Sequence, residues 1–186
     1  MRTFCTEGPV DPKLYYYVPR TALIAEGLKK VEQWRYFTIF APRQSGKTTY
    51  FQFLIEAIKR EKPDWLPVWV SFEAYGDIEL SYFLSSLRDR ILRGTELPEE
   101  TVLDFYNMDD IALKLREVAR FQKKEWVIIV DEIEGLKNLK VLNGFLHLIR
   151  SIYHEKQAIG LRSVILTGVS NITGIIQDTA SPFNIA

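Results

Sequence analysis

The segment from Ala41 to Thr48 constrains the fold more than any other part of this chain of 186 residues. Its sequence, A-P-R-Q-S-G-K-T, follows an apolar run over residues 36–40 and precedes a helical pattern. A strand, a tight loop and a helix in this order bring the loop's backbone N–H groups and the positive end of the helix dipole to one small volume. Only an anion satisfies such a volume, and G-K-T at the end of the loop is typical of a P-loop that cradles phosphates.

The residues of this loop have expected roles. Lys47 would reach the β- and γ-phosphates of a nucleoside triphosphate, and the Thr48 hydroxyl would hold Mg²⁺. Gly46, beside the phosphates, is the glycine that we expect the loop to require. The other residues expected to contact the nucleotide are Pro42, Arg43, Gln44, Ser45 and Thr49. For Arg43, a surface position without a ligand is an open alternative.

One position departs from the usual pattern G-x-x-x-x-G-K-[ST]. Ala41 stands where the pattern begins with glycine, and alanine does not adopt a positive φ cheaply. We therefore expect the loop to begin in a conformation that an L-residue tolerates, with Ala41 still part of the strand end. The alternative interpretation is a surface turn that happens to contain S-G-K-T.

A second apolar run, W-V-I-I-V over residues 126–130, predicts a strand buried on both faces. Asp131 and Glu132 follow it directly, and two carboxylates at the carboxyl end of such a strand form the Walker B arrangement. Asp131 would hold Mg²⁺, usually through water, and Glu132 would orient and deprotonate the attacking water. An acidic N-cap on the next helix is the competing interpretation. The phosphate-binding loop upstream favours the functional one.

Three segments together resemble the signatures of the AAA-like ATPases, nearest to their archaeal-type and STAND-like groups: I-F-A-P-R-Q-S-G-K-T-T, W-V-I-I-V-D-E-I-E-G-L and V-I-L-T-G-V-S-N. The resemblance implies a three-layer α/β P-loop NTPase fold whose mostly parallel sheet has the strand order 5-1-4-3-2. It also implies Mg²⁺-dependent ATP binding and hydrolysis, coupled to conformational change in a partner domain. A nucleotide-gated switch or assembly module with negligible turnover is the alternative.

The third of these segments ends in polar residues. In P-loop ATPases with an inserted strand beside the P-loop strand, such a residue reaches the γ-phosphate, and the candidates here are Thr167, Ser170 and Asn171. We expect Asn171 to contact the nucleotide. An N-cap on the following residues 172–177 is an equally open interpretation of Ser170 or Asn171.

Strand and helix patterns alternate along the chain, as an open α/β sheet requires. We expect an N-terminal arm over residues 1–19 and one P-loop nucleotide-binding domain over residues 20–186. Only four strand patterns precede Ala186, so the fifth strand is expected to be missing and the domain to be truncated at its C-terminus. The strand over residues 36–40 would then be an apolar sheet edge, which we expect the arm or a second subunit to cover.

Two features outside the motifs have alternative interpretations. The tyrosines at positions 15–17, together with Arg20, could form one wall of an adenine pocket, or they could pack as the core of the arm. Glu73 follows a predicted strand near residues 67–72 on the side of the sheet where ligands bind, and a solvated strand end is its alternative.

The composition limits the partners. The 24 basic and 24 acidic residues cancel, so no basic footprint indicates a nucleic-acid partner. The single cysteine, Cys5, excludes an intramolecular disulfide and suits a reducing cytoplasm. No apolar stretch approaches the roughly 18 residues of a membrane span. The expected partners are the nucleotide and either a homo-oligomer or a missing C-terminal domain, and the expected location is the cytoplasm.

Overall fold

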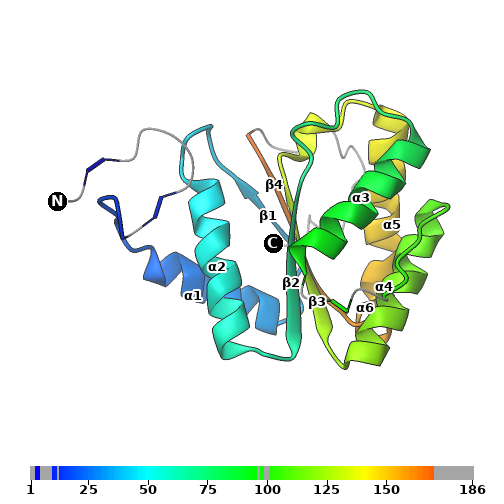
Figure 1. Ribbon diagram of the computed structural model, residues 1–186, viewed down its shortest axis with the longest axis horizontal. Helices are drawn as coiled ribbons and strands as arrows, with labels where there is room; N and C mark the ends of the chain where they lie inside the picture. Colours follow the sequence, from blue (N-terminus) through cyan, green and yellow to red (C-terminus); the bar gives the residue numbers. More distant parts are fainter. Residues whose placement is uncertain (1–2, 5–9, 12, 96, 99–100, 170–186) are drawn as a thin grey trace.

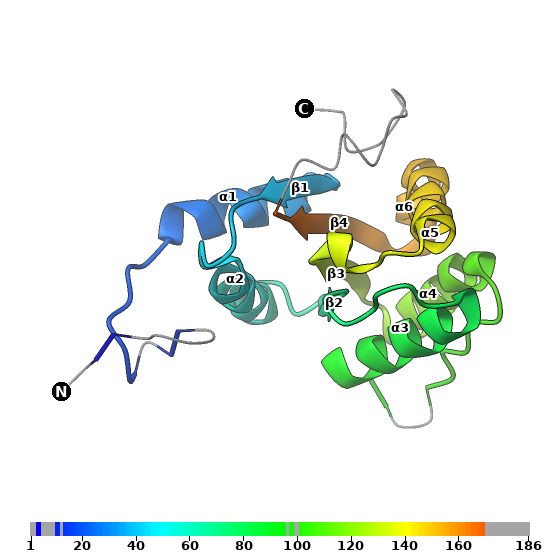
Figure 2. The ribbon, with the colours of Figure 1, turned by 90° about the horizontal axis from the view of Figure 1, so that it is seen from above.

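A sheet of four parallel strands forms the centre of the computed structural model, which describes residues 3–4, 10–11, 13–95, 97–98 and 101–169 (Figures 1 and 2). The strand order is β1-β4-β3-β2, and all three neighbouring pairs are parallel. This confirms the expected α/β fold and the order 5-1-4-3-2 without its fifth strand. The strands are β1 (Phe37–Phe40), β2 (Trp65–Ser71), β3 (Glu125–Asp131) and β4 (Leu161–Gly168).

Helices cover both faces of the sheet, which makes the three expected layers (Figure 2). One face carries α1 (Thr21–Glu32) and α2 (Lys47–Glu61). The other face carries α3 (Leu80–Gly94), α4 (Met108–Gln122), α5 (Leu139–Ile152) and α6 (Lys156–Ile159). Two 3₁₀ turns, η1 (Ile133–Gly135) and η2 (Tyr153–Glu155), flank α5.

Alternation along β3 divides the core into two clusters. Trp126 and Val130 pack with the larger cluster, under α3, α4 and α5, whereas Val127 and Ile129 pack with the smaller cluster, under α1 and α2. Because successive side chains of a strand point to opposite faces, a strand covered on both sides must be apolar throughout. The prediction of a strand buried on both faces is therefore confirmed, and Asp131 is delivered at its end.

A capping box and a close contact with β2 determine two helix ends. An Asn107 and Asp110 capping box begins α4, as each side chain accepts a hydrogen bond from the other residue's backbone N–H. The last residue of α3 is Gly94. A Cβ at this position would lie 3.0 Å from Cγ2 of Val68, so a small residue lets the end of α3 approach β2.

Two described residues of the N-terminal arm contact α2. The Val10 N–H donates to Oγ1 of Thr49 at 3.2 Å, and the Tyr17 and Phe53 rings are 4.8 Å apart. Figure 2 shows the arm beside α2 rather than along β1. Among the described strands β1 pairs only with β4, so of the two expected covers for its free edge, a second subunit stays the prediction.

Candidate nucleotide-binding site

The P-loop, residues 41–48, connects the end of β1 to the start of α2, in the order strand, loop and helix that the sequence predicts. Gly46 is the N-cap of α2 and has a φ of 82°, a left-handed conformation that strains any residue with a side chain. Ala41 stays outside the left-handed region, and its N–H donates to the Gly168 carbonyl at 3.3 Å. The loop therefore begins as a continuation of the β1–β4 pairing, which explains why alanine is tolerated where glycine is usual.

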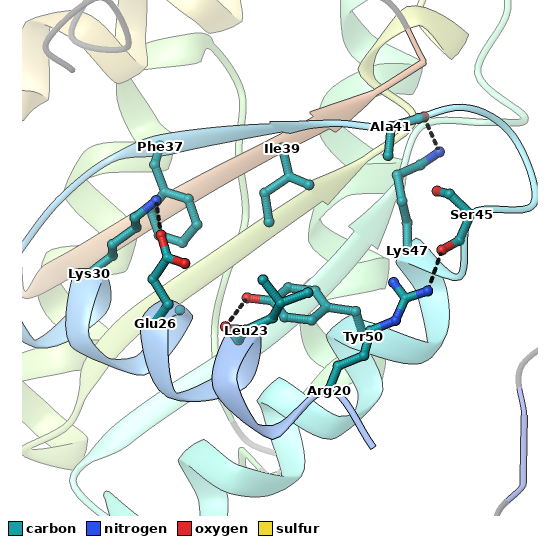
Figure 3. Close-up of a pocket in the computed structure, with 11 residues that line it drawn as sticks. Arg20, Leu23, Glu26, Lys30, Phe37, Ile39, Ala41, Ser45, Lys47 and Tyr50 are labelled. Atoms are coloured by element: carbon teal, nitrogen blue, oxygen red, sulfur yellow. Dashed lines mark hydrogen bonds and ion pairs between the residues drawn. The ribbon is translucent and has the colours of Figure 1, made fainter. Parts of the chain in front are cut away.

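Side chains of the P-loop and of the neighbouring helix α1 meet beside the loop (Figure 3). Nζ of Lys47 donates to the carbonyls of Ala41 and Pro42, at 2.8 and 3.1 Å. Arg20, the N-cap of α1, donates from Nη2 to the Ser45 carbonyl at 3.0 Å. The Ser45 Oγ is buried without a hydrogen-bond partner among the described residues, so its hydroxyl is available to a bound anion or water.

Two hollows border the P-loop. The first, which we call the α1 cavity, has a volume of about 310 Å³ and lies between α1, β1 and the loop (Figure 3). Leu23, Phe37 and Ile39 give it apolar walls. The second, which we call the arm cavity, has a volume of about 220 Å³, and its lining includes Tyr17, Val18, Gly46, Thr49 and Phe53. Both are also lined by Arg20 and Tyr50.

Asp131 lies at the end of β3 with a fixed orientation. It is 4% exposed, and its Oδ1 accepts hydrogen bonds from the Thr167 hydroxyl and, at 3.0 Å, from the Glu132 N–H. Thr167 is fully buried in the neighbouring strand β4. Of the three polar candidates at the end of β4, the structure thus places Thr167 beside Asp131, whereas Ser170 and Asn171 lie outside the described residues, as does Cys5.

Glu132 lies in a group of acidic side chains. Burial, followed by the charges of Glu73, Asp131 and Glu134, raises its pKa above the usual carboxylate value, while the Arg43 guanidinium acts in the opposite direction. The structure therefore brings Arg43 of the P-loop and Glu73, which follows β2, into the electrostatic environment of Glu132. A raised pKa makes Glu132 a stronger base than an exposed glutamate.

The oxygen ligands offered by this region fit Mg²⁺. Within the described ranges, no group of three or more His, Cys, Asp or Glu side chains is arranged to hold a metal ion alone. Mg²⁺ needs no such group, because it keeps several waters and shares the phosphates of its nucleotide. The Asp131 carboxylate and the Thr48 hydroxyl are hard oxygen donors of the kind that it prefers.

The sequence interpretation missed Glu134 and Gly135. Glu134 accepts a hydrogen bond from the Val169 N–H through Oε1 at 3.0 Å. An added Cβ on Gly135 would lie 2.2 Å from the Phe72 carbonyl oxygen. The acidic spacing D-E-I-E was visible in the sequence, but only the fold brings residue 134 to the end of β4.

Gly135→Ala is expected to destabilise the fold by about 1–3 kcal/mol, because the added methyl group collides with backbone rather than with a movable side chain. Urea denaturation followed by circular dichroism measures the change. Gly144→Ala is the matched control: its Cβ would meet only the Met108 side chain, at 3.5 Å. In the middle of α5 alanine is expected to be neutral or to add up to about 1 kcal/mol. Equal stability of the two variants would contradict the close approach at Gly135.

No helix in the described ranges has the length and apolar character needed to cross a bilayer.

Comparison with solved structures gives matches, although no protein-family model and no curated protein sequence matches the chain. The Walker-type ATPase of Pyrococcus abyssi is 17% identical with a TM-score of 0.63, over 89% of this chain and 50% of that one. Cdc6p from Pyrobaculum aerophilum is 16% identical with a TM-score of 0.59, over 93% and 46%. Drosophila ORC, in a structure with poly(dA/dT) DNA and Cdc6, is 11% identical with a TM-score of 0.57, over 84% and 25%.

These identities establish a shared fold and nothing finer. The chain spans half or less of the length of each of these proteins. The strand order, the P-loop between β1 and α2, and the Asp131 carboxylate at the end of β3 agree with that fold. The chain has the fold of the AAA-like P-loop ATPases.

Proposed function

We propose that this chain binds ATP with Mg²⁺ and hydrolyses it, and that hydrolysis drives conformational change in a partner domain or subunit. The observation that carries the proposal is the anion cradle at the start of α2, with Gly46 in the left-handed region and Ser45 Oγ buried without a partner among the described residues. A phosphate chain supplies the acceptors and the negative charge that this cradle requires. The Walker-type ATPase fold supports the same conclusion.

Each residue has a defined part in the proposed reaction. Lys47 exchanges its bonds to loop carbonyls for phosphate oxygens. Thr48 and Asp131 would hold Mg²⁺, which neutralises charge on the phosphates when it is bound. Glu132 orients a water molecule and accepts its proton, and its raised pKa suits that task. Arg43 lies close enough to influence Glu132, so we assign it to the phosphate side of the site.

The base of the nucleotide is proposed to lie in the arm cavity. This hollow reaches Gly46 and Thr49 at the start of α2, and the Tyr17 and Phe53 rings supply the flat apolar surfaces on which a base stacks. The expectation of an adenine wall formed by the arm agrees with this placement. The α1 cavity, which reaches the P-loop from the side of β1, is the alternative location.

The proposed partner is a protein rather than a nucleic acid. Nothing in the charge balance indicates nucleic acid, and the DNA and Cdc6 in the Drosophila ORC structure are partners of that protein. We propose a second subunit or a further domain as the recipient of the conformational change. A switch that binds nucleotide without turnover would use the same cradle, and substitution of Glu132 separates the two functions.

Phe53→Ala is expected to weaken ATP binding roughly 10-fold, because the loss of one base–aromatic stack costs on the order of 1–3 kcal/mol. Calorimetric titration with ATP and with ADP, each with and without Mg²⁺, measures the affinity. The variant should bind inorganic tripolyphosphate as the wild type does, since tripolyphosphate has no base. Leu23→Ala, in the α1 cavity, is the control and should bind ATP normally.

The titration has two adverse outcomes with different meanings. No binding of ATP to the wild type would overturn the proposed function. Weaker ATP binding by Leu23→Ala together with normal binding by Phe53→Ala would place the base in the α1 cavity and overturn only its proposed location.

A further inference from the structure

The turn η1 carries an acidic side chain that the proposed reaction does not use. Glu134 follows Glu132 by two residues and points to the end of β4, where its Oε1 accepts the Val169 N–H at 3.0 Å. The bond joins segments 35 residues apart in the chain. A carboxylate that accepts a backbone N–H makes a charge-assisted hydrogen bond, which is stronger than a neutral one.

The absence of a side chain at Gly168 makes room for this carboxylate. A Cβ built on Gly168 would lie 2.6 Å from Oε2 of Glu134, and the next nearest atom is 3.6 Å away. Gly168 does not have a positive φ, so its backbone alone does not require glycine. Space for the Glu134 carboxylate is therefore the structural reason for a glycine at this position.

Two hydrogen bonds connect the end of β4 to the segment from Asp131 to Glu134. Thr167 donates to the Asp131 carboxylate through its hydroxyl, and Val169 donates to Glu134 through its backbone. Glu132 lies between these two anchored acids and has a φ of 53°, in the left-handed region. A non-glycine residue keeps this conformation only when its surroundings impose it.

The opposite side of η1 is held by the turn that follows β2. The Gly76 N–H donates to the Gly135 carbonyl at 2.9 Å, and the Lys137 N–H donates to the Gly76 carbonyl at 2.6 Å. The turn is thus fixed between the two strands that flank β3. Glu134 supplies the attachment on the side of β4, which is the neighbour of the P-loop strand β1.

We propose that Glu134 is a positioning residue: its bond to Val169 fixes the turn and thereby sets the direction of the Glu132 carboxylate. The catalytic consequence rests on the proposed ATPase function, whereas the effect on the backbone of Glu132 does not.

Substitutions on the two sides of this contact test the proposal. Glu134→Ala is expected to lower kcat about 10- to 100-fold, as is usual when a group that orients a catalytic side chain is lost, and to leave the Kd for ATP unchanged. Glu134→Gln keeps an acceptor oxygen and is expected to restore most of the rate. Gly168→Ala displaces the Glu134 carboxylate and should reproduce the effect of Glu134→Ala. Because both remove one interaction, the double variant should be no slower than either single variant.

Amide hydrogen exchange supplies a readout that is independent of turnover. The N–H groups of Val169 and Glu132 should exchange faster in Glu134→Ala and Gly168→Ala than in the wild type. In Glu134→Gln the exchange rates should lie between the two, because the neutral amide oxygen accepts a weaker bond. Glu56→Ala, which removes an exposed glutamate from α2, is the control and should change neither amide. Melting temperatures establish that all variants are folded at the temperature of the assay.

Each adverse outcome identifies what has failed. Unchanged exchange at Val169 would show that the contact is absent in solution and would overturn the proposal. Faster exchange at Val169 with unchanged exchange at Glu132, or with wild-type kcat, would overturn the positioning role. A wild type that does not hydrolyse ATP would overturn the proposed function instead, while exchange at the two amides still decides whether Glu134 positions the turn.

Discussion

Lys47→Ala is expected to abolish measurable ATP binding and to slow turnover by at least about 100-fold, the usual effect of removing a charged donor from a developing oxyanion. Lys47 is the first residue of α2 and already points its ammonium group along the P-loop, at the Ala41 and Pro42 carbonyls. Alanine removes both the positive charge and the donors, while the loop's backbone N–H groups stay. Calorimetric titration with ATP and phosphate release measure the two effects.

A control separates loss of charge from loss of fold. Lys29→Ala removes an exposed lysine from the last turn of α1, away from the P-loop, and should bind and turn over ATP normally. The Lys47→Ala variant should have a circular dichroism spectrum like that of the wild type. The lysine side chain bonds only to the Ala41 and Pro42 carbonyls of the P-loop, so no helix or strand depends on it. Wild-type affinity for ATP in Lys47→Ala would mean that the P-loop is not the phosphate site.

Glu132→Gln is expected to reduce the single-turnover rate by about two or more orders of magnitude, the usual contribution of a general base, while ATP binding is retained. Glutamine keeps the size and most of the polarity of the side chain but accepts no proton from water. Turnover at the wild-type rate in Glu132→Gln would remove Glu132 from the mechanism. A wild type that binds ATP yet turns over as slowly as the variant would support the nucleotide-gated switch.

The raised pKa of Glu132 fixes the sign of two pH effects. Burial and the neighbouring carboxylates disfavour its charged form, so the wild-type rate should fall on acidification at a higher pH than for an ordinary glutamate. Stability changes in the other direction, because a carboxyl group with a raised pKa contributes stability below its unfolded-state pKa that is lost as the pH rises through the folded-state pKa. Glu132→Gln should therefore melt higher than the wild type at neutral pH, and the difference should vanish under acidic conditions.

The layers were predictable because the alternation of strand and helix patterns is local, whereas the strand order was implied by the resemblance to the AAA-like ATPases. β3 is apolar at every position between its ends since both faces are covered, and the same pattern places Asp131 at the carboxyl edge. The G-K-T sequence predicted the start of α2, and the structure begins that helix at Lys47. These signals extend over a few neighbouring residues, so no knowledge of distant contacts is needed to interpret them.

The parts that escaped prediction depend on contacts between distant segments. The contacts of Glu134 could not be predicted, because they exist only when β4 places Val169 and Gly168 beside it. The path of the arm could not be predicted either, because the tyrosines at positions 15–17 suit a base pocket and an apolar core equally well. The structure shows that Tyr17 packs against Phe53 of α2.

The pairing of β1 has a consequence for the order in which the domain forms. Phe37 of β1, the first described strand in the chain, pairs with Ile165 of β4, the last described strand. Such non-local pairing closes a long loop and is slow compared with the formation of helices. During synthesis from the N-terminus, the register of β1 in the sheet can therefore be fixed only after β4 has been synthesised. The anion cradle beside that strand is therefore completed after β4 has been synthesised, although α1 and α2 precede β4 in the chain.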